Sequence, residues 1–270
     1  MWKKRKPAIQ IKSRDQLDVM REAGLVVART LQRLTEAVKP GITTADLDAV
    51  AEESIRSEGA TPSFKGYQGF PACICTSVNE EIVHGIPSPS KVLAEGDIIS
   101  IDCGAIVDGW HGDSAVTVPV GEITPELRRL LDVCEESMWR GIAAGRADGR
   151  LSDIGHAVET YVRGQGDYGI VEEYVGHGIG TEMHMDPAVP NYGLPGRGPL
   201  LVPGMCFAVE PMVNLGTAET LLLNDDWTVI TADGRWSAHF EHTYAVTEDG
   251  PWVLTALDGG RERLKKAERA

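Results

Sequence analysis

The segment 96–118, GDIISIDCGAIVDGWHGDSAVTV, restricts the possible fold more than any other part of the chain. A two-stranded β-hairpin is predicted by the β-branched run over 98–101, the Asp108-Gly109 turn pair and the apolar return over 115–118. Asp102 lies in the first strand and Asp113 in the second, and a short connection places them opposite or diagonal to each other on one face. Two carboxylates side by side in an apolar sheet repel each other, and a bound cation removes this cost. The hairpin therefore indicates half of a metal site.

Composition narrows the class of protein without identifying it. The 270 residues carry a net charge of −14, so stable binding to nucleic acid is not expected. The basic cluster Trp2–Lys6 is interpreted as part of a solvated arm over 1–12, and a transient ribosome contact is the less favoured alternative. No stretch has the form of a signal peptide or a bilayer span. The five cysteines are odd in number and lack CxxC spacing, which favours a reducing, cytoplasmic location.

The chain contains an internal repeat of two helices followed by strands. Apolar periodicity predicts the helices over 13–38, 44–59, 124–144 and 152–165. Residues of the first half match residues of the second half at a nearly constant offset. The matching pairs are Asp46 with Asp153, Gly96 with Gly204 and Asp102 with Glu210. After a longer insertion in the second half, Asp113 matches Glu241. We therefore predict one α/β (α+β) domain over 13–258, with halves of about 13–122 and 123–258, and a charged tail over 259–270. Each half would place an acid on each of two strands.

Four carboxylates and one histidine form the candidate metal-ligand set. His177 lies in Gly-His-Gly-Ile-Gly, where the glycines leave the imidazole unobstructed. Carboxylate oxygens with one neutral imidazole suit two divalent ions such as manganese, iron, cobalt or zinc, with an acidified water between them. Taken singly, Asp113 is better explained as the end of a strand, and a lone histidine is more often structural. That structural explanation is strongest for His111, His156, His239 and His242. Only the repeat, which places acids in matching strands, favours the metal site.

Six motifs, found in order along nearly the whole chain, resemble type I methionine aminopeptidases. They are His84-Gly85-Ile86-Pro87, Ser100-Ile101-Asp102-Cys103-Gly104, His111-Gly112-Asp113, Gly176-His177-Gly178-Ile179-Gly180, Val209-Glu210-Pro211-Met212 and Phe240-Glu241-His242-Thr243. The resemblance implies the pita-bread fold, in which two pseudo-symmetric αβ halves with antiparallel sheets surround a dimetal site. It also implies a monomer. The stretch between His184 and Glu241 is too short for the helical insertion of the type II enzymes.

The resemblance implies specific roles for the residues that match the family motifs. The implied metal ligands are Asp102, Asp113, His177, Glu210 and Glu241, with Asp113 and Glu241 bridging the ions. Glu210 would also transfer a proton, His184 would stabilise the oxyanion, and His84 would contact the scissile amide. Residues at the places that line the methionine slot are Phe64, Tyr67, Phe70, Cys75, Met183 and Trp227. A weaker match to a monovalent-cation site involves Asn79, Glu81 and Ser237.

The function implied by this resemblance is removal of the initiator methionine from nascent polypeptides when the second residue is small. Two alternatives keep the same fold. The first is an Xaa-Pro aminopeptidase or prolidase, although those enzymes usually carry an extra N-terminal domain. The second is a non-catalytic binding module, which predicts the loss of one or more ligands, whereas all five ligand positions are filled here.

Overall fold

The computed structural model describes residues 9–267, and the two halves of the chain repeat one arrangement. The first half contains α1 (Arg14–Ala37), α2 (Thr44–Ser57), β1 (Thr61–Pro62), the 3₁₀ turn η1 (Tyr67–Gly69), β2 (Ile74–Val78), β3 (Glu81–Val83), β4 (Ile98–Val107) and β5 (Trp110–Pro119). The basic cluster Trp2–Lys6 lies outside the described residues.

The second half begins with α3 (Pro125–Ala144) and α4 (Ser152–Gln165). Its strands are β6 (Gly169–Ile170), β7 (Gly176–Gly178), β8 (Met185–Val189), β9 (Cys206–Val209), β10 (Met212–Asn214), β11 (Thr220–Leu222), β12 (Val229–Thr231), β13 (Ser237–His239), β14 (His242–Thr247) and β15 (Gly250–Val253). The charged segment after them contains the helix α5 (Arg261–Ala267), in which Arg263 pairs with Glu135 of α3 at 3.2 Å.

The four predicted helices are confirmed, and local capping explains where they begin. Ser13 and Gln16 form a reciprocal capping box at the start of α1, and Thr43 and Asp46 form one at the start of α2. Thr124 caps α3 ahead of Pro125, which occupies the first helical position, where its missing N–H costs nothing.

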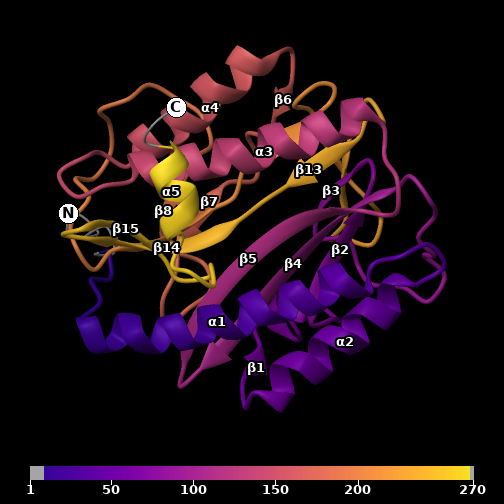
Figure 1. Cartoon of the computed structure of the whole chain (residues 1–270), viewed down its shortest axis with the longest axis horizontal. Helices are drawn as coiled ribbons and strands as arrows, with labels where there is room; N and C mark the ends of the chain where they lie inside the picture. Colours follow the sequence, from indigo (N-terminus) through magenta and orange to yellow (C-terminus); the bar gives the residue numbers. More distant parts are fainter. Residues whose placement is uncertain (1–8, 268–270) are drawn as a thin grey trace, which may run out of the picture.

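The helices cover the outer faces of two main sheets, so that the strands lie between the helix pairs (Figure 1). In the first half β4 pairs with β1, β2 and β5, and its core contains Leu34, Leu47, Ile55 and Ile101. In the second half the strand order is β15-β14-β9-β7-β8, and its core contains Leu130, Ile154, Phe207 and Tyr244. Each half therefore buries one sheet face under two helices, which confirms the predicted mixed α/β class.

Two features join the halves. The start of β14 runs beside β5: the N–H of Glu241 donates to the carbonyl of Ala115 at 2.9 Å, and the N–H of Ala115 donates to the carbonyl of Glu241 at 3.3 Å. A smaller sheet of order β11-β12-β3 takes strands from both halves. The seam between the halves therefore passes directly through residues of the predicted metal site.

One detail of the predicted repeat is wrong. Both acids of the first half lie within strands, but Glu210 follows the end of β9 and Glu241 precedes the start of β14. Pro211 has no N–H and cannot continue the ladder after Glu210. Glu241 leaves the β14 ladder because its backbone pairs with Ala115 of the other half.

Gly24 allows α1 to lie against the rest of the protein at backbone distance. A Cβ atom at this position would lie 2.2 Å from the carbonyl oxygen of Leu254. We therefore expect Gly24→Ala to lower the free energy of unfolding by about 2–3 kcal/mol, because a backbone atom must move. Urea denaturation measures this change.

Gly164 in α4 is the matched control, since nothing lies within 4 Å of a Cβ placed there. Gly164→Ala should leave stability unchanged or raise it by up to about 1 kcal/mol through helix propensity. Equal effects of the two substitutions would contradict the close approach of α1.

Candidate active site

The predicted hairpin is present, and it places its two aspartates on one face. In the β4–β5 register Asp102 lies opposite Ala115 and Asp113 lies opposite Gly104, so the two acids are diagonal neighbours. The turn residues Asp108 and Gly109 have φ angles of 47° and 79°, as expected for an Asp-Gly hairpin turn. A hydrogen bond joins the two carboxyl groups, and burial raises the pKa of Asp102 to about 7. The hairpin alone thus brings two like charges into contact.

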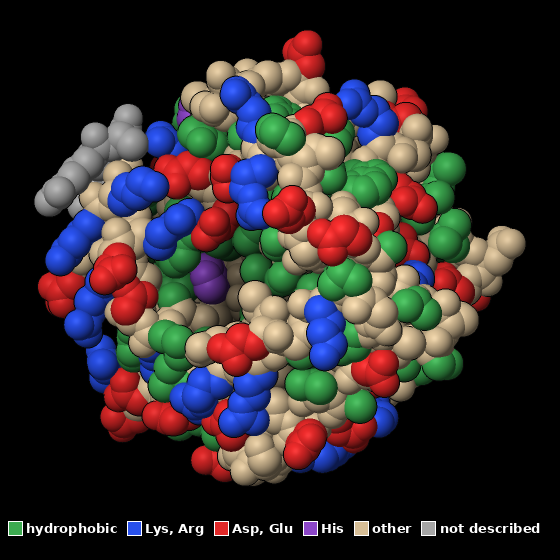
Figure 2. Space-filling model, turned by 45° about the vertical axis from the view of Figure 1, so that its right-hand side comes forward, with side chains coloured by type: hydrophobic (Ala, Val, Ile, Leu, Met, Phe, Trp, Pro, Cys, Tyr) green, Lys and Arg blue, Asp and Glu red, His purple; other side chains and the backbone are tan. Residues whose placement is uncertain are grey.

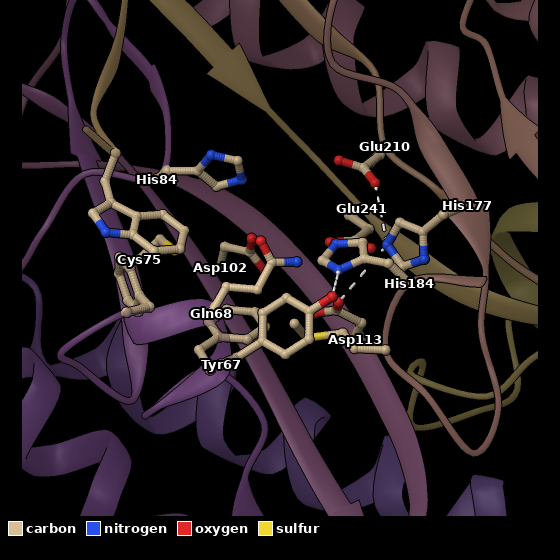
Figure 3. Close-up of a pocket in the computed structure, with 14 residues that line it drawn as sticks. Tyr67, Gln68, Cys75, His84, Asp102, Asp113, His177, His184, Glu210 and Glu241 are labelled. Atoms are coloured by element: carbon tan, nitrogen blue, oxygen red, sulfur yellow. Dashed lines mark hydrogen bonds and ion pairs between the residues drawn. The ribbon is translucent and has the colours of Figure 1, made fainter. Parts of the chain in front are cut away.

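The second half adds two glutamates to the same place. Glu241 is 1% exposed, and its backbone pairing with Ala115 holds it against β5. Glu210 lies opposite the hairpin, on the same side of the site as His177 (Figure 3). Burial is the largest cause that raises the pKa of Asp113, Glu210 and Glu241 well above the ordinary carboxyl values, and the neighbouring carboxylates raise it further.

His177 is held in the form that binds metals. Its Nδ1 lies 3.0 Å from the carbonyl oxygen of Gly178, so Nδ1 carries the proton and donates it. Its Nε2 lies 3.4 Å from Glu210 Oε1 and 4.0 Å from Asp113 Oδ2. Burial lowers the pKa of His177 to about 3, which keeps the ring neutral and leaves a lone pair on Nε2 facing the carboxylates.

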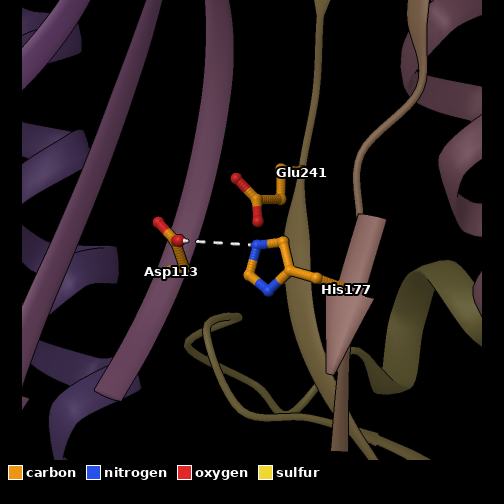
Figure 4. Close-up of side chains that lie close together, drawn as sticks. All are labelled: Asp113, His177 and Glu241. Atoms are coloured by element: carbon orange, nitrogen blue, oxygen red, sulfur yellow. Dashed lines mark ion pairs between the residues drawn. The ribbon is translucent and has the colours of Figure 1, made fainter. Parts of the chain in front are cut away.

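These side chains fit a divalent-cation centre. One ligand atom each from Asp113, His177 and Glu241 lie within 4.8 Å of one another (Figure 4). Three buried carboxyl oxygens, on Asp102, Asp113 and Glu241, have no hydrogen-bond partner. A buried oxygen without a partner is costly, and a cation provides one. The structure therefore contains an oxygen-rich set with one imidazole nitrogen that can hold metal.

A cavity of about 210 Å³ extends from these groups. Figure 2 shows a histidine at the bottom of a depression in the surface. The cavity is lined by the five predicted ligands, by His84 and His184, and by Phe64, Tyr67, Gln68, Phe70, Cys75, Met183 and Trp227. All of the residues predicted for the methionine slot thus lie together.

The end of the cavity away from the carboxylates is apolar. Phe64, Phe70, Cys75 and Met183 belong to one buried cluster, against which Trp227 packs. The rings of Phe70 and Trp227 meet edge to face with their centroids 5.0 Å apart. Aromatic and sulfur-containing side chains make favourable contacts with a thioether, so this end suits an unbranched, sulfur-containing side chain.

The two remaining predicted histidines lie at the cavity wall. His184 Nδ1 lies 2.9 Å from the hydroxyl of Tyr67, and its ring lies 4.3 Å from that of His177. His84 has a φ of 60° and is flanked by the rings of Tyr174 and Trp227, with centroids 5.6 Å and 6.3 Å away.

A second cavity of about 240 Å³ adjoins the first. It shares four lining residues with the first cavity, namely His84, Asp102, His184 and Glu210, and adds Glu173, Tyr174 and Val175 among others. The metal-ligand set therefore lies where two cavities meet, one with an apolar end and one that continues past His84.

Three residues at the site were not predicted from the sequence. His239, which the sequence suggested to be structural, is buried with its Nε2 3.7 Å from Glu210 Oε2. It ends β13 and lies two residues before Glu241, which is outside any strand, so strand alternation gives no signal for it. Gln68 lies in the turn between Gly66 and Gly69, and nothing in the local pattern marks it. Tyr174 carries no sequence signal either.

The weak cation-site prediction stays a prediction. The carbonyl of Asn79 accepts the N–H of Ser237 at 2.9 Å, so these two positions are adjacent. The carboxylate of Glu81 is paired with the ammonium group of Lys91.

Comparison with known proteins gives a consistent result. The sequence profile of metallopeptidase family M24 matches residues 18–248. A methionine aminopeptidase of Clostridium acetobutylicum is 54% identical over 250 residues, which cover 93% of this chain and 100% of that protein. The crystal structure of a methionine aminopeptidase from Rickettsia prowazekii superposes with a TM-score of 0.90 at 42% identity, covering 92% of this chain and 100% of that one.

More distant structures share the fold alone. A prolidase from Pyrococcus furiosus superposes with a TM-score of 0.73 at 22% identity, and the match covers 65% of the prolidase chain. Within residues 9–267, no helix has the length and apolar character needed to cross a bilayer.

Metal binding should depend on pH in a defined direction. The pKa of Asp102 is raised by burial to about 7, so its protonated form stabilises the metal-free protein, and this stability is lost as pH rises from about 4 through about 7. Divalent ions replace the protons, so the increase in Tm on adding Mn²⁺ should grow between about pH 5 and about pH 8.

Differential scanning calorimetry of the chelated protein, with and without Mn²⁺, measures this increase. The difference at each pH isolates the site, because other titrating groups contribute to both samples. A Tm increase that is constant across this range would contradict the carboxylate origin of the binding site.

Proposed function

The chain belongs to metallopeptidase family M24 and, within it, to the methionine aminopeptidases, and from this premise we propose that it removes the N-terminal methionine from nascent proteins whose second residue is small. One observation carries the proposal. Five ligand-type side chains from both halves meet at a cavity whose far end is apolar and rich in sulfur and aromatic groups. The ligand-type side chains suit metal-assisted hydrolysis, and the apolar end of the cavity suits a methionine side chain.

The proposed cofactor is a pair of divalent ions, drawn from manganese, iron, cobalt and zinc. Asp102, Asp113, His177, Glu210 and Glu241 would hold them. Bound there, such ions lower the pKa of a water molecule and polarise the scissile carbonyl. The partnerless oxygens of Asp102, Asp113 and Glu241 support this assignment.

Glu210 is the proposed proton carrier. Its carboxyl group lies at the junction of the two cavities, and burial raises its pKa well above the ordinary value. A carboxylate with a raised pKa accepts a proton from the attacking water and returns it to the departing amine. His239 Nε2, 3.7 Å from Glu210 Oε2, lies on the other side of this group.

His184 and His84 are proposed to bind the peptide bond. His184 Nδ1 lies 2.9 Å from the Tyr67 hydroxyl, and we assign the hydroxyl as the donor, which places the proton of the neutral ring on Nε2, where it is available to the carbonyl oxygen as negative charge develops there. His84 lines both cavities, which suits contact with the amide between the first and second residues.

The proposed catalytic unit is the single domain 13–258, acting as a cytoplasmic monomer on nascent chain N-termini. The Xaa-Pro alternative is less favoured because the prolidase is only 22% identical to this chain, whereas the methionine aminopeptidases of Clostridium acetobutylicum and Rickettsia prowazekii are 54% and 42% identical.

The first prediction concerns activity and its dependence on Glu210. The protein with Mn²⁺ or Co²⁺ should release methionine from Met-Ala-Ser and should leave Ala-Pro intact. Glu210→Gln should lower kcat by about 10²-fold or more, because the proton carrier is lost. The exposed glutamate Glu248 provides the control, and Glu248→Gln should keep full activity.

Metal content is measured in the same samples, because Glu210 is also a proposed ligand. Absence of methionine release with every divalent ion tested would overturn the proposed function.

The second prediction concerns Tyr67. Tyr67→Phe keeps the ring but removes the hydroxyl that donates to His184 Nδ1, so kcat should fall by about tenfold with KM for a short peptide nearly unchanged. The pH dependence of kcat should also change, because the Tyr67 hydroxyl no longer determines which ring nitrogen of His184 carries the proton.

Tyr192→Phe is the matched control, since the Tyr192 hydroxyl donates to the carbonyl of Glu172 outside both cavities. Equal kcat values for the two variants would show that Tyr67 only lines the cavity.

A further inference from the structure

The strand β11 presents an exposed apolar edge. Leu221, Leu222 and Leu223 are 52%, 56% and 38% exposed, and they follow one another directly. β11 is the outer strand of the β11-β12-β3 sheet, and within the described residues no strand pairs with its other side. An apolar strand edge that is left unpaired can form backbone hydrogen bonds with an extended segment of another chain.

Backbone groups of β11 are available along this edge. The N–H of Leu223 donates to the carbonyl of Thr228 at 2.8 Å, and the N–H of Ala232 donates to the carbonyl of Glu219 at 2.9 Å. Because hydrogen-bonding direction alternates along a strand, the N–H and C=O groups of Thr220 and Leu222 point away from β12. The edge thus offers both hydrogen bonds and apolar contact to an extended chain.

The same hairpin is part of the candidate active site. The turn between β11 and β12 carries Trp227, which lines the first cavity. At the other end of β11, the hydroxyl of Thr220 donates to the carboxylate of Glu173, which lines the second cavity. The β11–β12 hairpin therefore borders both cavities, the first through Trp227 and the second through the contact of Thr220 with Glu173.

We propose that the β11 edge binds the substrate polypeptide downstream of its second residue, as an added β-strand with apolar side chains against Leu221–Leu223. This inference rests on the proposed function and deepens it. A nascent chain is extended and unfolded, which is the conformation that strand addition requires.

Charge disfavours two other occupants of this edge. Glu219, Asp225 and Asp226 flank the leucines, and all three are exposed. A second copy of a chain with a net charge of −14 would bring the same acidic groups together, and a nucleic acid would add phosphates. A polypeptide with apolar or basic residues downstream of its N-terminus is not repelled by these acidic groups.

The test compares a tripeptide, Met-Ala-Gly, with a peptide of about ten residues that continues with alternating apolar residues and ends in lysine. The wild-type protein with Mn²⁺ should show a higher kcat/KM for the long peptide. Leu222→Ser should lower this value by about fivefold through KM and leave the tripeptide value unchanged. Leu194→Ser is the control, because Leu194 is 72% exposed and lines neither cavity.

N-methylated long peptides test the strand pairing itself. If the peptide adds to the β11 edge, methylation of successive downstream amides should raise KM at alternate positions only.

Equal kcat/KM for long and short peptides, or equal values for Leu222→Ser and Leu194→Ser, would overturn this inference and leave the proposed function intact. Failure to hydrolyse even the tripeptide would instead overturn the proposed function. A Leu222→Ser variant that changes only self-association, measured by sedimentation, would assign the edge to a second copy.

Discussion

The backbone pairing between Ala115 and Glu241 is the contact on which the arrangement of this protein depends. It ties β5 of the first half to the start of β14 in the second half. Because Asp113 lies two residues from Ala115, and Glu241 is itself a partner in the pairing, the same contact that joins the halves brings their acids together. Neither half contains the complete set of proposed ligands, so the proposed metal site is formed only where the halves meet.

This placement has an electrostatic cost. Burial raises the pKa of all four carboxyl groups, and repulsion from neighbouring carboxylates raises it further at Asp113, Glu210 and Glu241. A structure that concentrates like charges in its interior is stabilised by protons at low pH and by cations at higher pH. The same burial keeps His177 neutral, so one physical cause prepares both kinds of ligand.

The residues proposed to recognise the substrate come from different parts of the chain than the proposed metal ligands. The ligands come from the sheets and their immediate ends, whereas the apolar end of the cavity is built largely from the η1 turn region and the β11–β12 connection. These connecting segments carry Tyr67, whose hydroxyl lies 2.9 Å from His184 Nδ1, and Trp227, which lines the cavity from the turn after β11. The rigid seam would thus position the chemistry while the loops select the substrate.

The sequence by itself determined the features that depend on short-range chemistry. The capping residues, the apolar periodicity of four helices, the Asp-Gly turn and the spacing of the repeat each act over a few neighbouring residues or as a direct comparison of segments. They predicted the helices, the hairpin and the mixed α/β class, and the set of acids expected at a shared centre. Only the tertiary structure decided the contact of Tyr67 with His184, the position of His239 beside Glu210 and the exposure of β11. These depend on how the loops close and on which strand edges stay unpaired, and such contacts arise from packing between segments that are distant in the chain, which no local pattern encodes.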